Sequence, residues 1–140
     1  MVNNAALRRT IHPVHAVLLA GSLPLFLGAL LSDLAYSSSY QVQWANFASW
    51  LLAGGLVLEG PALLWSLVRL LRPEVRRDRR WLLFVVFLAA TFILGFVNSL
   101  VHAKDAWAMM PEAIFLSVIV FLLGCAATWL GFSRFGKEEV

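Results

Sequence analysis

Seven polar residues in this chain have the types and spacing needed to hold a cofactor or to move a proton. They are His12, His15, Asp33, Glu59, Asn98, His102 and Asp105. Imidazole binds haem iron and metal ions and exchanges protons near neutral pH, and a neighbouring carboxylate orients its ring. The candidate chemistry is therefore cofactor binding or proton transfer, and the choice depends on which of these residues lie together.

Four of these residues form a predicted outer-face polar cluster. Asn98, His102 and Asp105 recur at intervals of four and three residues, which places them on one face of a helix. Asp33 closes another apolar segment at the same level. A histidine held by one or two carboxylates is a sensible site at this level, and we expect His102 to be held by Asp33 and Asp105.

His12 and His15 lie at the opposite level, with Pro13 suited to the first turn of a helix. Two histidines at this spacing can ligate one metal ion, but a metal site usually has three or four protein ligands and no third one reaches this level. A rise of about 1.5 Å per residue separates them from His102 by roughly 30 Å, too far to share one metal or haem. All three histidines remain candidate cofactor ligands, and a polar helix start is the alternative for His12 and His15.

Glu59 lies near the middle of an apolar stretch, where an ionised carboxylate costs several kcal/mol. We therefore expect it to be protonated or hydrogen-bonded to Ser22, Thr91 or Ser117 of a neighbouring helix. A proton relay, a ligand to a cofactor headgroup and a simple interhelical hydrogen bond all stay open for this intramembrane carboxylate.

The elements that position these residues are predicted to be membrane helices. Of the 140 residues, 61% are hydrophobic and 14% are charged, against about 45–50% and about 25% in soluble domains. Four apolar stretches, at about 14–34, 47–71, 81–101 and 112–132, match the roughly 20 residues that span a bilayer. We expect an all-α integral membrane protein, a single domain over 1–140, folded as an up-down-up-down four-helix bundle.

Ten of the 11 Lys and Arg residues lie on one side of such a bundle. Arg8 and Arg9 precede the first span, Arg134 and Lys137 follow the fourth, and the others lie in or beside a basic loop at 72–80. Those others are Arg69, Arg72, Arg76, Arg77, Arg79 and Arg80. The positive-inside rule then places both termini in the cytoplasm. The arginines are expected to lie against lipid headgroups, so no nucleic-acid partner is implied.

The residues above also resemble a bacterial family of small four-span membrane proteins known only as a domain of unknown function. The resemblance runs from about His12 to Phe132. It rests on His12-Pro13-Val14-His15, on Asp33, on the segment from Asn98 to Trp107 with its His-x-Lys-Asp-Ala-Trp piece, and on Leu116-Ser117 and Thr128-Trp129-Leu130-Gly131. Similar modules accompany or are joined to redox proteins, so the resemblance implies a membrane electron-transfer setting.

Three functions are compatible with these observations, and none of the soluble-enzyme motifs is present. The first is an accessory, redox-associated module linked to haem b or quinone in the bacterial inner membrane, with a redox partner or a second copy of the chain. The second is a non-catalytic structural or anchor subunit, and the third is a small proton or metal carrier. The cofactor, if there is one, stays open between haem b and none, and so does the metal.

Overall fold

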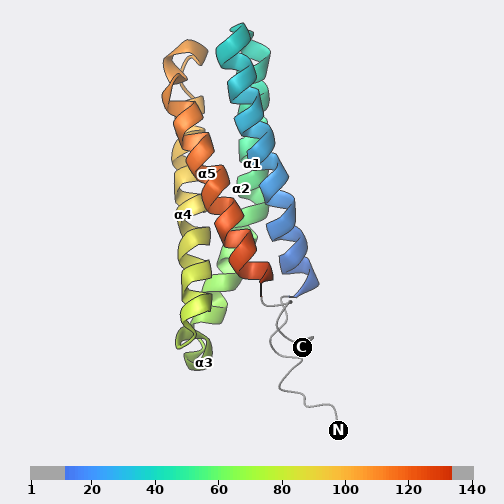
Figure 1. Cartoon of the computed structure of the whole chain (residues 1–140), viewed down its shortest axis with the longest axis vertical. Helices are drawn as coiled ribbons and strands as arrows, with labels where there is room; N and C mark the ends of the chain where they lie inside the picture. The colour runs from blue at the N-terminus through green and yellow to red at the C-terminus, as the bar shows by residue number, and fades with distance from the viewer. Residues whose placement is uncertain (1–11, 134–140) are drawn as a thin grey trace.

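The computed structural model describes residues 12–133 and consists mainly of four long helices (Figure 1). They are α1 (Pro13–Ser39), α2 (Val42–Leu70), α4 (Arg79–His102) and α5 (Glu112–Phe132). A short helix, α3 (Pro73–Arg76), joins α2 to α4, and a 3-10 turn, η2 (Ala106–Met109), lies between α4 and α5. No strand occurs between residues 12 and 133, so the predicted all-α class is confirmed.

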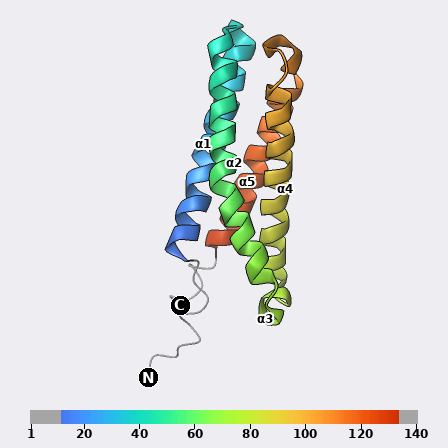
Figure 2. The same cartoon turned by 180° about the vertical axis from the view of Figure 1, so that it is seen from behind.

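The long helices run alternately up and down in one bundle (Figures 1 and 2). α1 begins and α5 ends near the end of the bundle that carries α3, whereas η2 and the α1–α2 turn lie at the opposite end. We call these the α3 end and the η2 end. α1 packs against α2 and α5, and α4 packs against the same two helices, which confirms the up-down-up-down arrangement.

Each of the four long helices is long and apolar enough to cross a membrane. They contain between 21 and 29 residues, whereas about 20 are needed to span the hydrocarbon core. Their outward faces expose large apolar side chains, including Val17, Trp50, Val57 and Leu122. Soluble proteins rarely expose apolar surface on this scale, so these faces are suited to contact with lipid.

Two helices extend well past the apolar stretches seen in the sequence. α1 continues to Ser39 and α2 begins at Val42, so the turn between them contains only Tyr40 and Gln41. The hydroxyls of Ser37, Ser38 and Ser39 donate to backbone carbonyls three or four residues earlier in α1. Tyr40 then ends the helix in the left-handed region, with φ 56°. Hydropathy marks the part of a helix suited to lipid, whereas backbone hydrogen bonding continues into the polar segment.

The basic loop expected at 72–80 contains α3 and the first two residues of α4. The carboxylate of Asp78 accepts from the backbone N–H groups of Arg80 and Trp81, which caps the start of α4. Four other basic residues used in the orientation argument, Arg8, Arg9, Arg134 and Lys137, lie outside the described residues.

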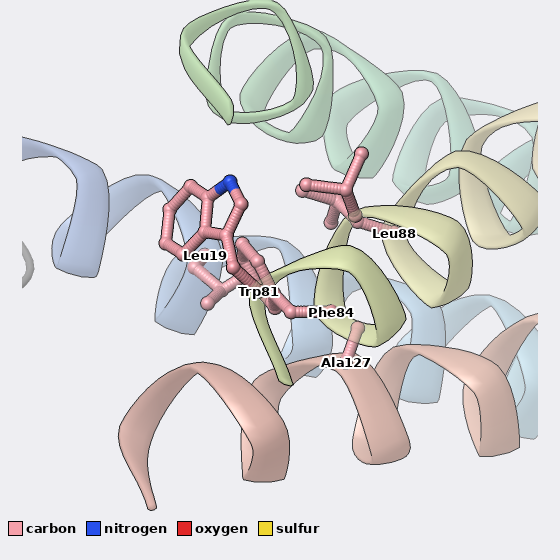
Figure 3. Packing of buried hydrophobic residues seen from close by; sticks show 6 residues of the cluster. Leu19, Trp81, Phe84, Leu88 and Ala127 are labelled. Atoms are coloured by element: carbon pink, nitrogen blue, oxygen red, sulfur yellow. The ribbon is translucent and has the colours of Figure 1, made fainter. Parts of the chain in front are cut away.

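The bundle interior contains three apolar clusters at successive levels. The α3-end cluster consists of Leu19, Trp81, Phe84, Val85, Leu88 and Ala127 (Figure 3). The middle cluster consists of Phe26, Ala29, Leu52 and Val120. The η2-end cluster consists of Tyr36, Ala45, Met109 and Ala113. Buried polar residues also lie between these clusters, such as Thr91 on α4 and Asp33 on α1. The buried ring of His15 lies beside the α3-end cluster, 6.0 Å from that of Phe84.

The ring of Phe26 on α1 lies directly over Gly55 on α2. A Cβ atom added at Gly55 would lie 2.5 Å from Cε1 of Phe26 and 2.8 Å from its Cδ1. Such distances are shorter than any normal carbon contact. Phe26 is buried and packed within the middle cluster, so its ring has little room to move away. A glycine is therefore required at this position.

Candidate functional site

Four polar side chains meet near the η2 end, between the middle cluster and the η2-end cluster. Nε2 of His102 lies 2.8 Å from Oδ1 of Asp33. The hydroxyl of Ser117 donates to Oδ2 of Asp33 at 2.5 Å, and Nδ2 of Asn98 donates to Oγ of Ser117 at 2.8 Å. The side chains of His102 and Asp33 are 1% and 0% exposed. We call these four residues, which come from α1, α4 and α5, the polar cluster.

Helical spacing brings these side chains to the interior. Asp33 follows Phe26 and Ala29 on the buried face of α1, and His102 follows Asn98 by four residues on α4. Ser117 lies on the buried face of α5, three residues before Val120. Each helix therefore presents its polar residue on the same stripe that forms the apolar core.

The directions of the hydrogen bonds determine how many protons the polar cluster holds. Nδ1 of His102 lies 2.9 Å from the carbonyl oxygen of Asn98, and a carbonyl only accepts, so Nδ1 carries a hydrogen. The single O–H of Ser117 is directed to Asp33. One proton therefore lies between Nε2 of His102 and Oδ1 of Asp33. The pair is neutral overall, either as imidazolium and carboxylate or as imidazole and carboxylic acid.

One acceptor of the polar cluster remains open. Oδ1 of Asn98 is buried and has no hydrogen-bond partner among the described residues. The orientation of the amide is set by Ser117, because the hydroxyl of Ser117 is already used toward Asp33 and its oxygen must accept from the amide N–H. The cluster therefore has room for one more donor on this oxygen.

Asp105 lies apart from the polar cluster. α4 ends at His102, and Asp105 is an exposed residue at the start of η2, where its side chain makes no capping hydrogen bond. The helical spacing used to group it with Asn98 therefore stops at His102. The structure brings together Asp33, Asn98 and His102, as expected, and adds Ser117 in the role expected of Asp105.

His15 is buried near the α3 end and ties α1 to α2. Its Nε2 lies 3.0 Å from the carbonyl oxygen of Ala62 and 3.0 Å from Oγ of Ser66. Since the hydroxyl of Ser66 itself donates to Ala62 at 2.8 Å, both oxygens accept from Nε2–H of His15. His12 is exposed, and its Nδ1 accepts from the backbone N–H of Val14 at 3.3 Å.

His12 and His15 both lie beside the ring of Trp65 and do not form a metal site. The ring centroids of His12 and His15 lie 5.2 and 6.2 Å from that of Trp65. Within residues 12–133 no group of three or more His, Cys, Asp or Glu side chains could hold a metal ion. His12 thus occupies the N-cap position of α1, as expected for a polar helix start, and His15 forms an interhelical bond.

Glu59 lies on the buried face of α2 at 1% exposure. Its Oε2 has no hydrogen-bond partner in the described part of the chain. The three partners expected for it bond elsewhere: Ser22 and Thr91 donate to carbonyls of their own helices at 2.9 and 2.8 Å, and Ser117 donates to Asp33. The carboxyl group is therefore enclosed in the bundle with one oxygen unpaired.

Haem b does not fit between His102 and either of the other two histidines as they are arranged. Both ring nitrogens of His102 are engaged in hydrogen bonds, and Nε2 of His15 is engaged as well. His12 and His15 lie at the α3 end, away from His102, and the interior between these levels is filled by the α3-end and middle clusters. An axial ligand needs a free lone pair directed toward the iron, and His102 presents none.

Two partners in these sites were not anticipated from the sequence. Ser66 accepts from His15, and Ser117 donates to Asp33 instead of Glu59. The sequence does single out Ser117, because Leu116-Ser117 is one of the segments that carry the family resemblance. Ser117 also lies on the face of its helix that carries the small residue Gly124. Nothing in the spacing of Ser66 distinguishes a partner of His15 from a packing residue.

A family model described as "Predicted membrane protein (DUF2231)" matches residues 11–135. No curated protein and no solved structure matches the chain. The matched range includes the whole polar cluster together with His12, His15 and Glu59.

Proposed function

This chain belongs to the DUF2231 family of predicted membrane proteins, and we propose that it is an accessory, redox-associated module of the bacterial inner membrane. In this proposal it works beside a redox partner that supplies the catalytic groups. The observation that carries this proposal is the use of the buried imidazoles. Both ring nitrogens of His102 and Nε2 of His15 form hydrogen bonds to other helices or to the same helix. These bonds stabilise the bundle, and in this proposal the cofactor chemistry belongs to the partner.

The redox association rests on the resemblance to membrane modules that accompany or are joined to redox proteins. In this proposal the haem or quinone belongs to the partner, since the polar cluster of this chain does not offer a free imidazole nitrogen. A purely structural anchor subunit is the alternative. It uses the same bundle and differs only in the chemistry of the partner.

A proton or metal carrier receives less support from the packing. A carrier needs a continuous polar path, whereas an apolar cluster separates buried polar residues of this chain. The middle cluster lies between the polar cluster and the level of Glu59. This apolar layer interrupts such a path.

The test is purification of the full chain from its native membranes in mild detergent. We expect it to co-migrate with a protein that carries a redox cofactor, and we expect the absorbance of that cofactor to disappear when the chain is expressed alone. A chain that migrates by itself as a monomer would refute the accessory role. A chain that binds haem when expressed alone would refute the assignment of the cofactor to the partner.

The proposed orientation follows from charge. The described arginines from Arg69 to Arg80 lie at or near the α3 end, whereas Lys104 is the basic residue near the η2 end among residues 12–133. The positive-inside rule then assigns the α3 end to the cytoplasm and the η2 end to the opposite side.

A further inference from the structure

We propose that Asp33 and His102 form a proton-exchange site that opens only toward the η2 end of the bundle. Oδ1 and Nε2 lie 2.8 Å apart and share one proton. The hydrogen-bond directions do not fix which of the two atoms carries this proton. This inference concerns the chain itself and does not depend on a redox partner.

Access from the interior is blocked by the middle cluster. Along α4 the next buried polar residue below Asn98 is Thr91, seven residues away, which corresponds to about 10 Å of helix. Phe26, Leu52 and Val120, each 1% exposed, fill this interval. A proton that enters from the level of Glu59 would have to cross this apolar layer.

The opposite side is closed by a thinner element. Met109, at 1% exposure, belongs to the four-residue turn η2 and packs with Tyr36 and Ala113 over the polar cluster. A 3-10 turn between two helices has fewer backbone hydrogen bonds to hold it than the long helices on the other side, so it opens at lower cost. The η2 end is therefore the route by which water reaches the pair.

Gain or loss of a proton changes the contact between the two side chains. When hydronium gives one proton to the pair, Oδ1 and Nε2 both carry hydrogen and two donors face each other. When water takes the shared proton, two acceptors face each other. Either change separates Asp33 from His102, and after proton gain the open Oδ1 of Asn98 offers an acceptor in the same cluster.

Five other titratable groups of the described residues lie at this end of the bundle, and the charge of the Asp33–His102 pair is balanced within the pair. They are Tyr36 and Tyr40 on or after α1, Lys104 and Asp105 before η2, and Glu112 at the start of α5. The three charged residues are exposed, and Tyr36 lies against the ring of Tyr40 at a centroid distance of 6.3 Å. α2 contributes the small residue Ala45 at this level.

The experiment is NMR of the full chain in lipid nanodiscs, with ¹⁵N-labelled histidine and ¹³C-labelled aspartate. Over roughly pH 4 to 8, we expect any transition in the Asp33 signal to appear also in the His102 signal, because the protonation steps of strongly coupled groups belong to the pair. Asp33→Asn should remove this shared transition while the His15 signal stays unchanged. Signals of Asp33 and His102 that stay constant over the whole range would overturn the proposal.

Two matched variants test the direction of access. Met109→Ala and Leu52→Ala each shorten a side chain that is 1% exposed, one on each side of the pair. In Met109→Ala we expect the N–H protons of His102 to exchange with water about tenfold faster, since a weakened turn opens more often. In Leu52→Ala we expect this exchange rate to be unchanged. Equal rates in the two variants, whether both are raised or both unchanged, would overturn the one-sided site even if Asp33→Asn failed to fold.

Discussion

Nε2 of His102 lies 2.8 Å from Oδ1 of Asp33, a contact that joins α1 to α4 across 69 positions of the sequence. The extensive contacts of the bundle run between α1 and α2, α1 and α5, α2 and α4, and α4 and α5. The Asp33–His102 contact therefore crosses the bundle diagonally, and Ser117 adds α5 to the same connection. Directional bonds of this kind select one helix register, which apolar packing in lipid specifies only weakly.

Replacing Asp33 should therefore destabilise the bundle more than replacing any hydroxyl partner. Asp33→Ala leaves Nε2 of His102 and the hydroxyl of Ser117 without an acceptor, and we expect a loss of about 2–4 kcal/mol in the free energy of unfolding. Ser117→Ala removes the hydrogen bond to the carboxylate and the acceptor of the Asn98 amide. At about 0.6 kcal/mol for each bond, it should cost about 1 kcal/mol. Unfolding by SDS in mixed micelles, monitored by circular dichroism, measures both.

Ser37→Ala is the matched control for Ser117→Ala. The hydroxyl of Ser37 is exposed and donates to a carbonyl of its own helix at 2.9 Å, so its removal should change the free energy of unfolding by less than about 0.5 kcal/mol. If Asp33→Ala were as stable as the unmodified chain, the polar cluster would not contribute to the fold.

Two adjacent glycines on α2 should respond differently to the same substitution. A Cβ at Gly55 would lie 2.5 Å from Cε1 of Phe26, whereas a Cβ at Gly54 would lie 3.4 Å from Cδ1 of Leu25. Gly55→Ala should therefore cost about 1–3 kcal/mol through overpacking, and Gly54→Ala should be neutral or slightly stabilising because alanine favours the helix. The same micelle titration distinguishes them, and equal effects would contradict the close approach of α1 and α2.

Reporter fusions test the proposed orientation. A reporter inserted after Arg77, beside α3, should show cytoplasmic activity, and one inserted after Lys104, before η2, should show activity only on the far side of the membrane. The physical reason is the excess of arginines near the α3 end. The reverse pattern would place the η2 end and the polar cluster on the cytoplasmic side and would contradict the proposed orientation.

Much of the fold follows directly from the hydropathy of the sequence. Apolar stretches of membrane length predict the four helices, and short connections predict their antiparallel order, because every backbone polar group must be satisfied within lipid. The buried stripes of α1 and α4 follow from helical spacing, which correctly brings Asp33, Asn98 and His102 to the interior. What hydropathy does not supply is the end of a helix in a polar segment, as at Ser39, or the rotation of one helix against another.

The partners of the buried polar groups depend on that rotation. Ser117 is at a suitable spacing to face either Asp33 or Glu59, and only the packing of α5 against α1 decides for Asp33. Trp81 is a similar case, because its position at a span end is typical of an interfacial anchor. The structure instead buries it at 2% exposure beneath Arg69, whose guanidinium carbon lies 4.7 Å from the ring centroid.

Glu59 offers a prediction of the opposite sign from that for Asp33. Because Oε2 of Glu59 is buried without a hydrogen-bond partner among the described residues, its carboxyl group contributes a desolvation cost that no such bond offsets. Replacing it by an apolar side chain of similar size removes this cost. We therefore expect Glu59→Leu to raise the free energy of unfolding by about 1 kcal/mol.

Ser66→Ala, seven residues further along the same buried face of α2, is the matched control. Ser66 accepts from Nε2 of His15 at 3.0 Å, so its loss should lower the free energy of unfolding by about 0.6 kcal/mol, the usual worth of one hydrogen bond between membrane helices. Both variants are measured by SDS unfolding against the unmodified chain. If Glu59→Leu were less stable than Ser66→Ala, the carboxyl group of Glu59 would be making a stabilising interaction in lipid, and its role as an unpaired group in the bundle would be wrong.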